Sequence, residues 1–328
     1  MPGVGCGIST APNHPSLRVQ RHWGQTRPRK GFRVSGISPP VTLQGFTNDI
    51  NTLERAVKER VFYVKEDDAF VAPPRPLDKH FAEALSCTRD RLRKYLPNSA
   101  PLTYQQWIDT VRGPKRRIYE QAFASLLRRS LESKDAHLKV FVKYEKVDFT
   151  KKLDPVPRVV SPRSPRYNLE LGRFLKPLEE RLFKSIGKLF GMKTVMKGMD
   201  AVGVATEMRK KWDHFLDPVA VGLDASRFDQ HVSLDALQWE HGIYVDCVPK
   251  CYRRKLKWLL KMQCKNQCTG VCEDGILKYS VKGGRMSGDM NTSLGNCLLM
   301  CAMVYSYGLK CGFEIQLANN GDDCVVFM

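Results

Sequence analysis

Residues 320–323, Asn-Gly-Asp-Asp, lie between two apolar runs, Phe313 to Ala318 and Cys324 to Met328. An Asn-Gly pair between apolar runs predicts a β-hairpin, so we expect two strands joined by a tight turn that carries two carboxylates. Neighbouring carboxylates repel each other unless a cation neutralises them. These four residues alone are ordinary turn chemistry. Their interpretation therefore depends on acids elsewhere in the chain.

A third acid stands at the end of another predicted strand. Val219 to Leu223 is a short apolar segment, and Asp224 follows it where the chain turns toward Asp229. Phosphoryl transfer with two cations needs carboxylates that converge from separate strands. If the strands are neighbours, Asp224 and Asp322 satisfy this requirement. The alternative is that both acids only cap turns.

A glycine-containing segment, Gly283-Gly-Arg-Met-Ser-Gly-Asp-Met-Asn-Thr-Ser-Leu-Gly-Asn296, separates these acids. Its first half predicts a mobile loop whose backbone can approach a ligand. A helix is expected from Asn291 or Thr292 onward, which places Thr292 and Asn296 on one face, a turn apart. Helix capping explains Thr292 but not Asn296, which lies a full turn inside.

Together these segments resemble motifs A, B and C of viral RNA-dependent RNA polymerases. Motif A corresponds to Asp224-x4-Asp229, motif B to Ser287-Gly288-x3-Thr292-x3-Asn296, and motif C to Gly321-Asp322-Asp323. The amino-acid sequences of residues 284–296 and 157–177 are similar to those of the replicases of tombusvirus-like plant viruses. The resemblance extends from about Phe46 onward.

The resemblance implies a role for each matching residue. Asp224 and Asp322 would hold Mg²⁺, with Mn²⁺ as the alternative ion, and Asp323 would be a supporting acid. The residues that would select the ribose or contact the nucleotide are Asp229, Ser287, Gly288, Thr292 and Asn296. A carboxylate with an amide can recognise a 2′-hydroxyl, because that group both donates and accepts a hydrogen bond.

Residues 141–163 resemble motif F, the basic strands above the nucleotide channel. A triphosphate near carboxylates needs fixed positive charge, and the planar guanidinium of Arg158 suits phosphate oxygens. The further candidates are Lys143, Lys151 and Lys152. A solvated basic face is the alternative. For Lys146 and Arg163 both interpretations stay open.

The overall charge favours a polyanionic partner. The chain of 328 residues has 53 Lys and Arg against 34 Asp and Glu, a formal charge of +19. Residues 250–265 contain no acid, and Arg253, Arg254 and Lys257 are the candidates for RNA binding. Tyr252 and Trp258 in this segment are expected to face the core. Binding to an anionic membrane surface is the second interpretation.

Periodicity predicts an α+β fold in which helices dominate. Helices are expected over 48–64, 77–96 and 104–133, with a break at 112–117. Further helices are expected to begin at Pro177, to end near Trp212 and to follow Ser233. Eleven cysteines form neither a zinc pattern nor, without a secretory signal, a disulfide framework, so most are expected to be buried thiols. No apolar run is long enough to span a membrane.

By resemblance, the architecture is a right-hand polymerase with fingers and part of the palm. Residues 1–45 form a basic Pro- and Gly-rich segment, 46–215 the fingers with motif F (141–163) and the start of the palm, and 216–328 the palm. The palm holds motif A (219–229), motif B (283–300) and motif C (319–325), with a basic finger insertion near 246–282. Motif D, motif E and the thumb would follow Met328. We therefore expect a partial replicase with little activity alone.

The expected function is template-directed RNA synthesis from ribonucleoside triphosphates during viral RNA replication. Expected partners are the RNA template and nascent strand, with another viral replication protein and host factors implied by resemblance. The expected location is the host cytoplasm, at membrane-associated replication complexes. The alternatives are a reverse transcriptase-like polymerase, which usually has a bulky aromatic where Asp229 stands, and a non-catalytic basic RNA-binding protein.

Overall fold

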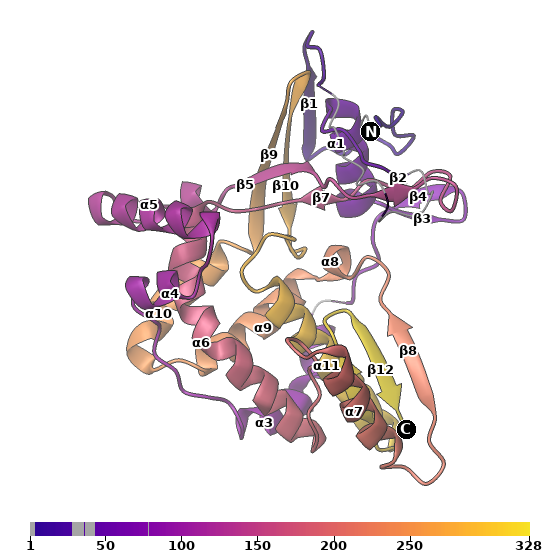
Figure 1. Cartoon of the computed structure of the whole chain (residues 1–328), viewed down its shortest axis with the longest axis vertical. Coiled ribbons are helices and arrows are strands. Elements are labelled where there is room, and N and C mark those ends of the chain that lie inside the picture. The colour runs from indigo at the N-terminus through magenta and orange to yellow at the C-terminus, as the bar shows by residue number, and fades with distance from the viewer. Residues whose placement is uncertain (1–3, 28–35, 37–42, 78) are drawn as a thin grey trace. The chain divides into compact units, whose positions relative to one another are not determined.

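The computed structural model describes residues 4–27, 36, 43–77 and 79–328. The chain divides into two compact units, each assembled from separate stretches of sequence. Unit 1 comprises Met1–Pro74, Ser133–Ser164 and Lys265–Asp289, and unit 2 comprises Arg75–Glu132, Pro165–Cys264 and Met290–Met328. The elements are labelled in Figure 1.

Unit 1 is built around a five-stranded sheet in the order β1-β10-β9-β5-β7. These strands are β1 (Leu17–Arg21), β5 (Leu138–Val142), β7 (Val159–Val160), β9 (Lys265–Cys272) and β10 (Gly275–Lys282). β9 and β10 form a long hairpin (Figure 1). Neighbouring strands are antiparallel except β5 and β9, which run parallel.

One face of this sheet is covered by helix α1 (Ile50–Val57). Asp49 caps the helix, since its side chain accepts a hydrogen bond from the backbone N of Thr52. Leu53 and Val57 are fully buried with Leu277 and Val140 of the sheet. Unit 1 also contains η1 (Lys58–Phe62, a π-helix), η2 (Ser133–Ala136, a 3-10 helix), and two small sheets: β2 (Leu43–Gln44) with β6 (Val147–Asp148), and β3 (Val64–Glu66) with β4 (Ala69–Val71).

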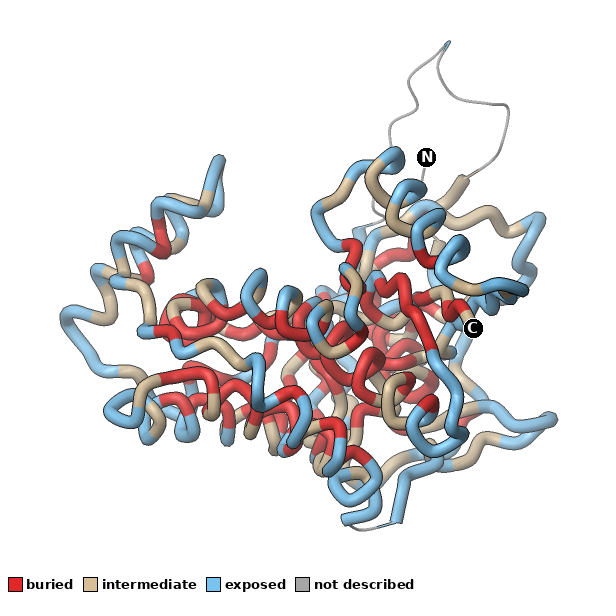
Figure 2. The backbone as a smooth tube through the Cα atoms, turned by 90° about the horizontal axis from the view of Figure 1, so that it is seen from below, coloured by how far each residue is buried: buried red, intermediate tan, exposed pale blue. Residues whose placement is uncertain are grey.

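Unit 2 is mainly helical. Its helices are α2 (His80–Ala84), α3 (Ser86–Arg93), α4 (Tyr104–Asp109), α5 (Pro114–Arg128), α6 (Pro165–Phe190), α7 (Ala201–Trp212), α8 (Phe228–His231), α9 (Leu234–Asp246), α10 (Lys250–Lys261) and α11 (Thr292–Cys311). Buried and exposed residues alternate along the helical tubes (Figure 2), as amphipathic helices require. A three-stranded antiparallel sheet, β11-β12-β8, completes the unit.

Several helix predictions are confirmed, and three need correction. The predicted start at Pro177 is wrong, because α6 begins at Pro165 and Pro177 lies inside it. The helix predicted over 48–64 changes to a π-helix at Lys58 and ends before Val64. The helix over 77–96 is divided near Leu85 into α2 and α3. Within the N-terminal segment, Leu17–Arg21 is a strand, and the basic residues Arg29, Lys30 and Arg33 of this segment lie outside the described residues.

Candidate active site

The Asn-Gly-Asp-Asp segment forms the turn between β11 (Gln316–Asn319) and β12 (Asp323–Phe327), so the hairpin prediction is confirmed. Gly321 has a φ of +104°, a conformation that favours glycine. The fully buried Asn319 holds this turn, because its Oδ1 accepts from the N of Gly321 at 3.1 Å and its Nδ2 donates to the O of Gly321 at 2.7 Å. The turn is therefore fixed by a side chain that precedes it.

Asp224 ends strand β8 (Ala220–Asp224), which pairs with β12. The register places Asp224 directly opposite Asp323, and Asp322 is the next residue in the turn. Opposed residues of an antiparallel pair have Cα atoms about 4.5–5.5 Å apart and side chains on one face. The strands of the predicted acids are thus neighbours, although the direct partner of Asp224 is Asp323 and not Asp322. Asp224 and Asp323 are exposed, and Asp322 is half-buried.

The chemistry of these acids suits a hard cation. Carboxylate oxygens are the ligands of Mg²⁺, which usually takes one or two carboxylates and completes its shell with water and phosphate. Among the described residues no group of three or more His, Cys, Asp or Glu side chains is preassembled to hold a metal.

Asp229 and Asn296 are brought together, as the sugar-selection prediction requires. Asp229 lies in the short helix α8, and Asn296 lies in the first turns of α11. The Nδ2 of the buried Asn296 donates a hydrogen bond to Oδ1 of Asp229 at 2.9 Å. Thr292 begins the same helix and is half-buried. Asn296 is thus paired with motif A and is not a helix cap.

A buried polar network holds the start of α11, and the sequence patterns did not reveal it. Asn291 donates from Nδ2 to Oε1 of Glu240 at 2.7 Å and accepts at Oδ1 from Nε2 of Gln263 at 2.8 Å. The hydroxyl of Tyr244 donates to the same Glu240 oxygen at 2.8 Å. All four residues are at most 1% exposed. These residues come from separate segments of the chain. The sequence signal that could have indicated the network is a polar residue among the apolar residues of each segment.

In unit 1, the motif B loop (residues 283–289) is attached to the strand of motif F. Ser287 Oγ accepts from the N of Ser161 at 3.2 Å and lies 3.3 Å from the O of Val159, to which it donates. Gly288 forms a bridge to Pro162, and a Cβ at this glycine would lie 2.6 Å from the Cα of Pro162. At Gly288 the absence of a side chain allows two backbone segments to approach each other closely.

Arg163, for which both interpretations stayed open, is a buried structural residue. Its guanidinium pairs with both carboxylate oxygens of Asp289, donates from Nη2 to Oδ1 of Asn266 at 2.7 Å, and donates from Nη1 to the O of Ala136 at 2.8 Å. Arg163 and Asp289 are 4% and 9% exposed. This pair fixes the end of the motif B loop.

The motif F cations are accessible. Lys143 Nζ lies 3.1 Å and Arg158 Nη1 lies 3.5 Å from the same oxygen, Oε2 of Glu145. Arg158 immediately precedes β7. Lys151 and Lys152 are exposed in the turn after β6. All four cations belong to unit 1, whereas Asp224 and Asp322 belong to unit 2.

The basic segment 250–265 contains helix α10, with Leu256, Leu259 and Leu260 buried. Arg254 and Lys257 are exposed, and Arg253 is half-buried, with its Nε donating to the O of Val248 at 3.1 Å. The prediction that Tyr252 and Trp258 face the core is wrong, because each is 38% exposed. Lys255 Nζ lies 4.9 Å from the centre of the Trp258 ring. The outer face of α10 is therefore basic and partly aromatic.

The cysteine prediction is confirmed for the majority. No disulfide joins the eleven cysteines in the described part of the chain, and six are buried: Cys247, Cys268, Cys272, Cys297, Cys301 and Cys324. Burial raises the pKa of Cys247, Cys268 and Cys297 to about 12. These thiols act as small apolar groups.

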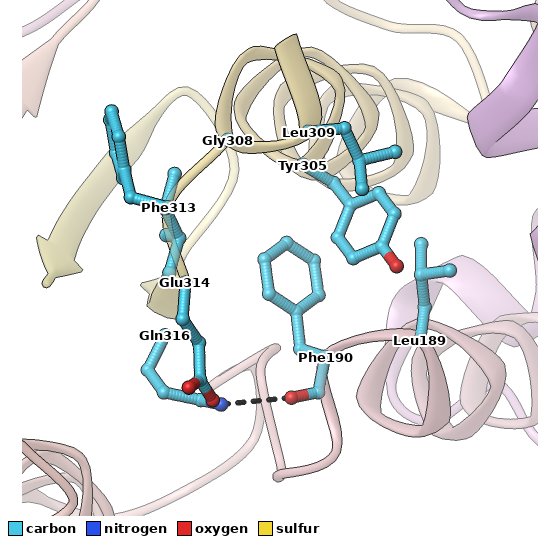
Figure 3. A pocket seen from close by; sticks show the side chains of 9 residues that line it. Leu189, Phe190, Tyr305, Gly308, Leu309, Phe313, Glu314 and Gln316 are labelled. Atoms are coloured by element: carbon cyan, nitrogen blue, oxygen red, sulfur yellow. Dashed lines mark hydrogen bonds between the residues drawn. The ribbon is translucent and has the colours of Figure 1, made fainter. Parts of the chain in front are cut away.

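Unit 2 also contains a pocket of about 260 Å³ between the ends of α6 and α11 and the start of β11. Phe190 and Tyr305 line it with their rings edge to face, 5.1 Å between centroids, and Gln316 Nε2 donates to the O of Phe190 at 2.9 Å (Figure 3). No predicted site residue lines this pocket. Across the described stretches of the chain, every helix is too short or too polar to cross a bilayer.

A family model described as viral RNA dependent RNA polymerase matches residues 17–328. The chain therefore belongs to the viral RNA-dependent RNA polymerases. It is similar to proteins named RNA-directed RNA polymerase from plant viruses. The protein of oat chlorotic stunt virus (isolate United Kingdom) is 54% identical over 333 residues, which cover 99% of this chain and 44% of the relative.

Two further relatives carry the same name. The protein of tobacco necrosis virus (strain A) is 46% identical over 99% of this chain and 44% of its own length. That of turnip crinkle virus is 42% identical over 96% of this chain and 40% of its own length. The expected kinship with tombusvirus-like replicases is confirmed, and the chain spans less than half the length of these relatives.

Proposed function

We propose that this chain carries the nucleotidyl-transfer centre of a viral RNA polymerase, which joins ribonucleoside triphosphates on an RNA template. The observation that carries the proposal is the pairing of β8 with β12, which places Asp224 opposite Asp323 and beside the turn that holds Asp322. We assign the β11-β12-β8 sheet to the palm of a right-hand polymerase and the sheet of unit 1 to its fingers. Membership of the polymerase family supports this assignment.

In this proposal, Asp224 and Asp322 hold two Mg²⁺ ions, with Asp323 in support; Mn²⁺ has the same ligand preference. Bound ions of this kind activate the attacking hydroxyl and stabilise the departing oxygen. The 3′-oxygen of the nascent strand forms a bond to the α-phosphorus, and the bond from the α-phosphorus to the pyrophosphate oxygen breaks. The aspartates would fix the geometry of this exchange, because Asp224 and Asp323 are opposed on neighbouring strands and Asp322 lies in the turn beside them.

Asp229 and Asn296 distinguish ribose from deoxyribose. Their 2.9 Å hydrogen bond orients the carboxylate and the amide, which can then accept from and donate to the 2′-hydroxyl. A deoxyribose would leave these polar groups without their added partner, which costs binding energy. A reverse transcriptase-like activity is disfavoured, because a carboxylate stands where such enzymes usually place a bulky side chain.

Arg158 and Lys143 orient the triphosphate, with Lys151 and Lys152 adding positive charge. Their accessible side chains and their shared partner Glu145 support this role, since a bound phosphate can replace one carboxylate. Arg253, Arg254 and Lys257 contribute contacts to RNA. We also propose, by the sequence resemblance alone, that the protein works at membrane-associated replication complexes in the host cytoplasm with a further viral replication protein and host factors.

The test is Asp322→Asn in a polymerase that contains this chain, beside Asp217→Asn as a matched control at an exposed acid before β8. We expect Asp322→Asn to weaken Mn²⁺ binding in calorimetry and to reduce template-directed incorporation at least 100-fold, with the control near wild type. Unchanged metal affinity and synthesis would overturn the proposal. Intact RNA binding without any metal effect would favour the non-catalytic RNA-binding alternative.

A further inference from the structure

The five-stranded sheet of unit 1 has a second face that helix α1 does not cover. Side chains alternate across a sheet, so one set of residues points to the core and the other points away from it. In β5, Leu138, Val140 and Val142 are buried, whereas Lys139 and Phe141 are exposed. We call the outward set the open face.

The open face is positively charged. Its cations come from four different segments of the chain and are Arg18, Lys139, Lys265, Lys278 and Lys282, all exposed. The strand register aligns three of them. Arg18 of β1 is opposite Lys278 of β10, and Thr269 of β9 is the register partner of both Lys278 and Lys139 of β5. These residues form a row across four strands, which is about 14 Å wide at a strand spacing of about 4.8 Å. Lys282 is opposite Lys265 in a second pair.

This charge has no counterpart within the sheet. The five strands contain no Asp or Glu. The nearest acids along the hairpin are Glu273, which lies 3.8 Å from Arg27 Nε, and Asp274, which accepts from the N of Ile50. Among the described residues, none of the five open-face cations takes part in a salt bridge. Because like charges directly opposite each other destabilise a sheet, an anionic ligand would relieve this repulsion.

Apolar side chains lie beside the row of cations. Val271 pairs with Ile276 and is 65% exposed. Phe141 follows Val140, the partner of Gly270, so it neighbours Val271, and Phe141 is 38% exposed. A ring on a flat basic sheet provides a surface on which a base can stack.

We propose that the open face binds single-stranded RNA, with Arg18, Lys139 and Lys278 on phosphates and Phe141 against a base. Charge complementarity identifies a polyanion, and the exposed aromatic favours unpaired bases over a duplex, whose bases are stacked inside. An anionic membrane is the weaker candidate, because membrane-surface binding uses a broad apolar face and this face exposes only a few apolar side chains. The site acts through phosphates and bases and does not depend on the metal chemistry proposed above.

The experiment compares two triple variants of the full chain that carry the same change in charge. One is Arg18→Glu, Lys139→Glu, Lys278→Glu on the open face. The matched control is Lys115→Glu, Lys188→Glu, Lys310→Glu at exposed positions of α5, α6 and α11. Binding of a fluorescent single-stranded RNA of about 12 nucleotides is measured by anisotropy in EDTA across a salt series. Thermal unfolding of each variant is measured alongside.

We expect the open-face variant to bind at least 10-fold more weakly and to unfold at the wild-type temperature. The slope of log K against log salt should fall by about 2, since each phosphate contact contributes about 0.7 on single strands. The control should lose less than 3-fold. Phe141→Ala should weaken binding with an unchanged salt slope. Equal losses in both triple variants, or less than a 2-fold loss in the open-face variant, would overturn the proposal.

Two additions distinguish RNA binding at the open face from membrane binding and from the metal site. Vesicles of phosphatidylserine and phosphatidylcholine replace the RNA in a parallel series; if the open-face variant loses vesicle binding but keeps RNA binding, the face binds membrane and the proposal is wrong. Asp322→Asn should bind RNA like wild type in EDTA. The experiments therefore give different results if the proposed metal site is wrong and if the proposed RNA binding at the open face is wrong.

Discussion

Asn296 Nδ2 donates to Asp229 Oδ1 over 2.9 Å, which joins a helix start and a short helix that are 67 residues apart. One partner is buried and the other is half-buried. The two residues belong to separate sequence motifs, and the fold brings them into one hydrogen-bonded group. Whatever binds beside them meets a carboxylate whose orientation is set by an amide.

This pair predicts the sugar preference. Asn296→Ala should leave Asp229 without its partner and reduce the preference for ribo- over deoxynucleotides by about 10-fold or more, because a hydrogen bond to a charged group contributes about 1.5–3 kcal/mol. Incorporation of each nucleotide by the polymerase gives the ratio of kcat/KM. Asp217→Asn serves as the control, and an unaltered ratio in Asn296→Ala would contradict the assigned role.

The Arg163–Asp289 pair predicts a large stability effect in unit 1. Asp289→Asn should destabilise the protein by about 3–5 kcal/mol, because it leaves a buried guanidinium without its counter-charge. Replacing both residues by apolar ones, Arg163→Met with Asp289→Leu, should cost less than the single change. Urea unfolding measures both values; a harmless Asp289→Asn would show that the pair does not hold the motif B loop.

Lys211 predicts an unusual pH dependence. The residue is fully buried at the end of α7, and its Nζ has no hydrogen-bond partner in the described part of the chain. Burial lowers its pKa to about 8 from 10.5. Below pH 8 the buried charge destabilises the fold; between pH 8 and 10.5 the unfolded chain binds more protons, so stability rises with pH. Lys211→Met should therefore be more stable than wild type at pH 7, by up to about 3 kcal/mol.

The advantage of Lys211→Met should shrink as the pH rises from 8 toward 10.5. Unfolding curves at several pH values test this, with Lys210→Met as the control because Lys210 is exposed and paired with Glu207. A constant difference between Lys211→Met and wild type across this range would contradict a lowered Lys211 pKa.

The cysteines predict selective labelling. Cys87, Cys251 and Cys311 are exposed, whereas burial raises the pKa of Cys297 to about 12 and of Cys324 to about 11. Because the thiolate is the reactive form, a thiol reagent at pH 8 should modify the three exposed residues quickly and the buried ones only after unfolding. Mass spectrometry of partially labelled protein identifies the sites. Early modification of Cys297 would indicate that this part of unit 2 opens.

Sequence patterns predicted the elements that depend on local chemistry. Asn-Gly between apolar segments predicted the turn at 320–323, and Ser233 predicted a helix start because its hydroxyl can accept from a backbone N–H, as it does from Ala236. Spacing along one helix placed Thr292 and Asn296 on the same face. The helix start predicted at Pro177 was wrong. Proline suits the first turn of a helix, but Pro177 lies inside the long helix α6.

The amino-acid sequence by itself determined the family and the positive charge and indicated which acids to propose for the site, because residue identity and short-range spacing carry that information. Only the tertiary structure decided which acids stand opposite each other, that Arg163 is buried against Asp289, and that cations from four separate segments share one face of a sheet. Strand register and the burial of polar groups arise from contacts between distant segments, and no local pattern records them.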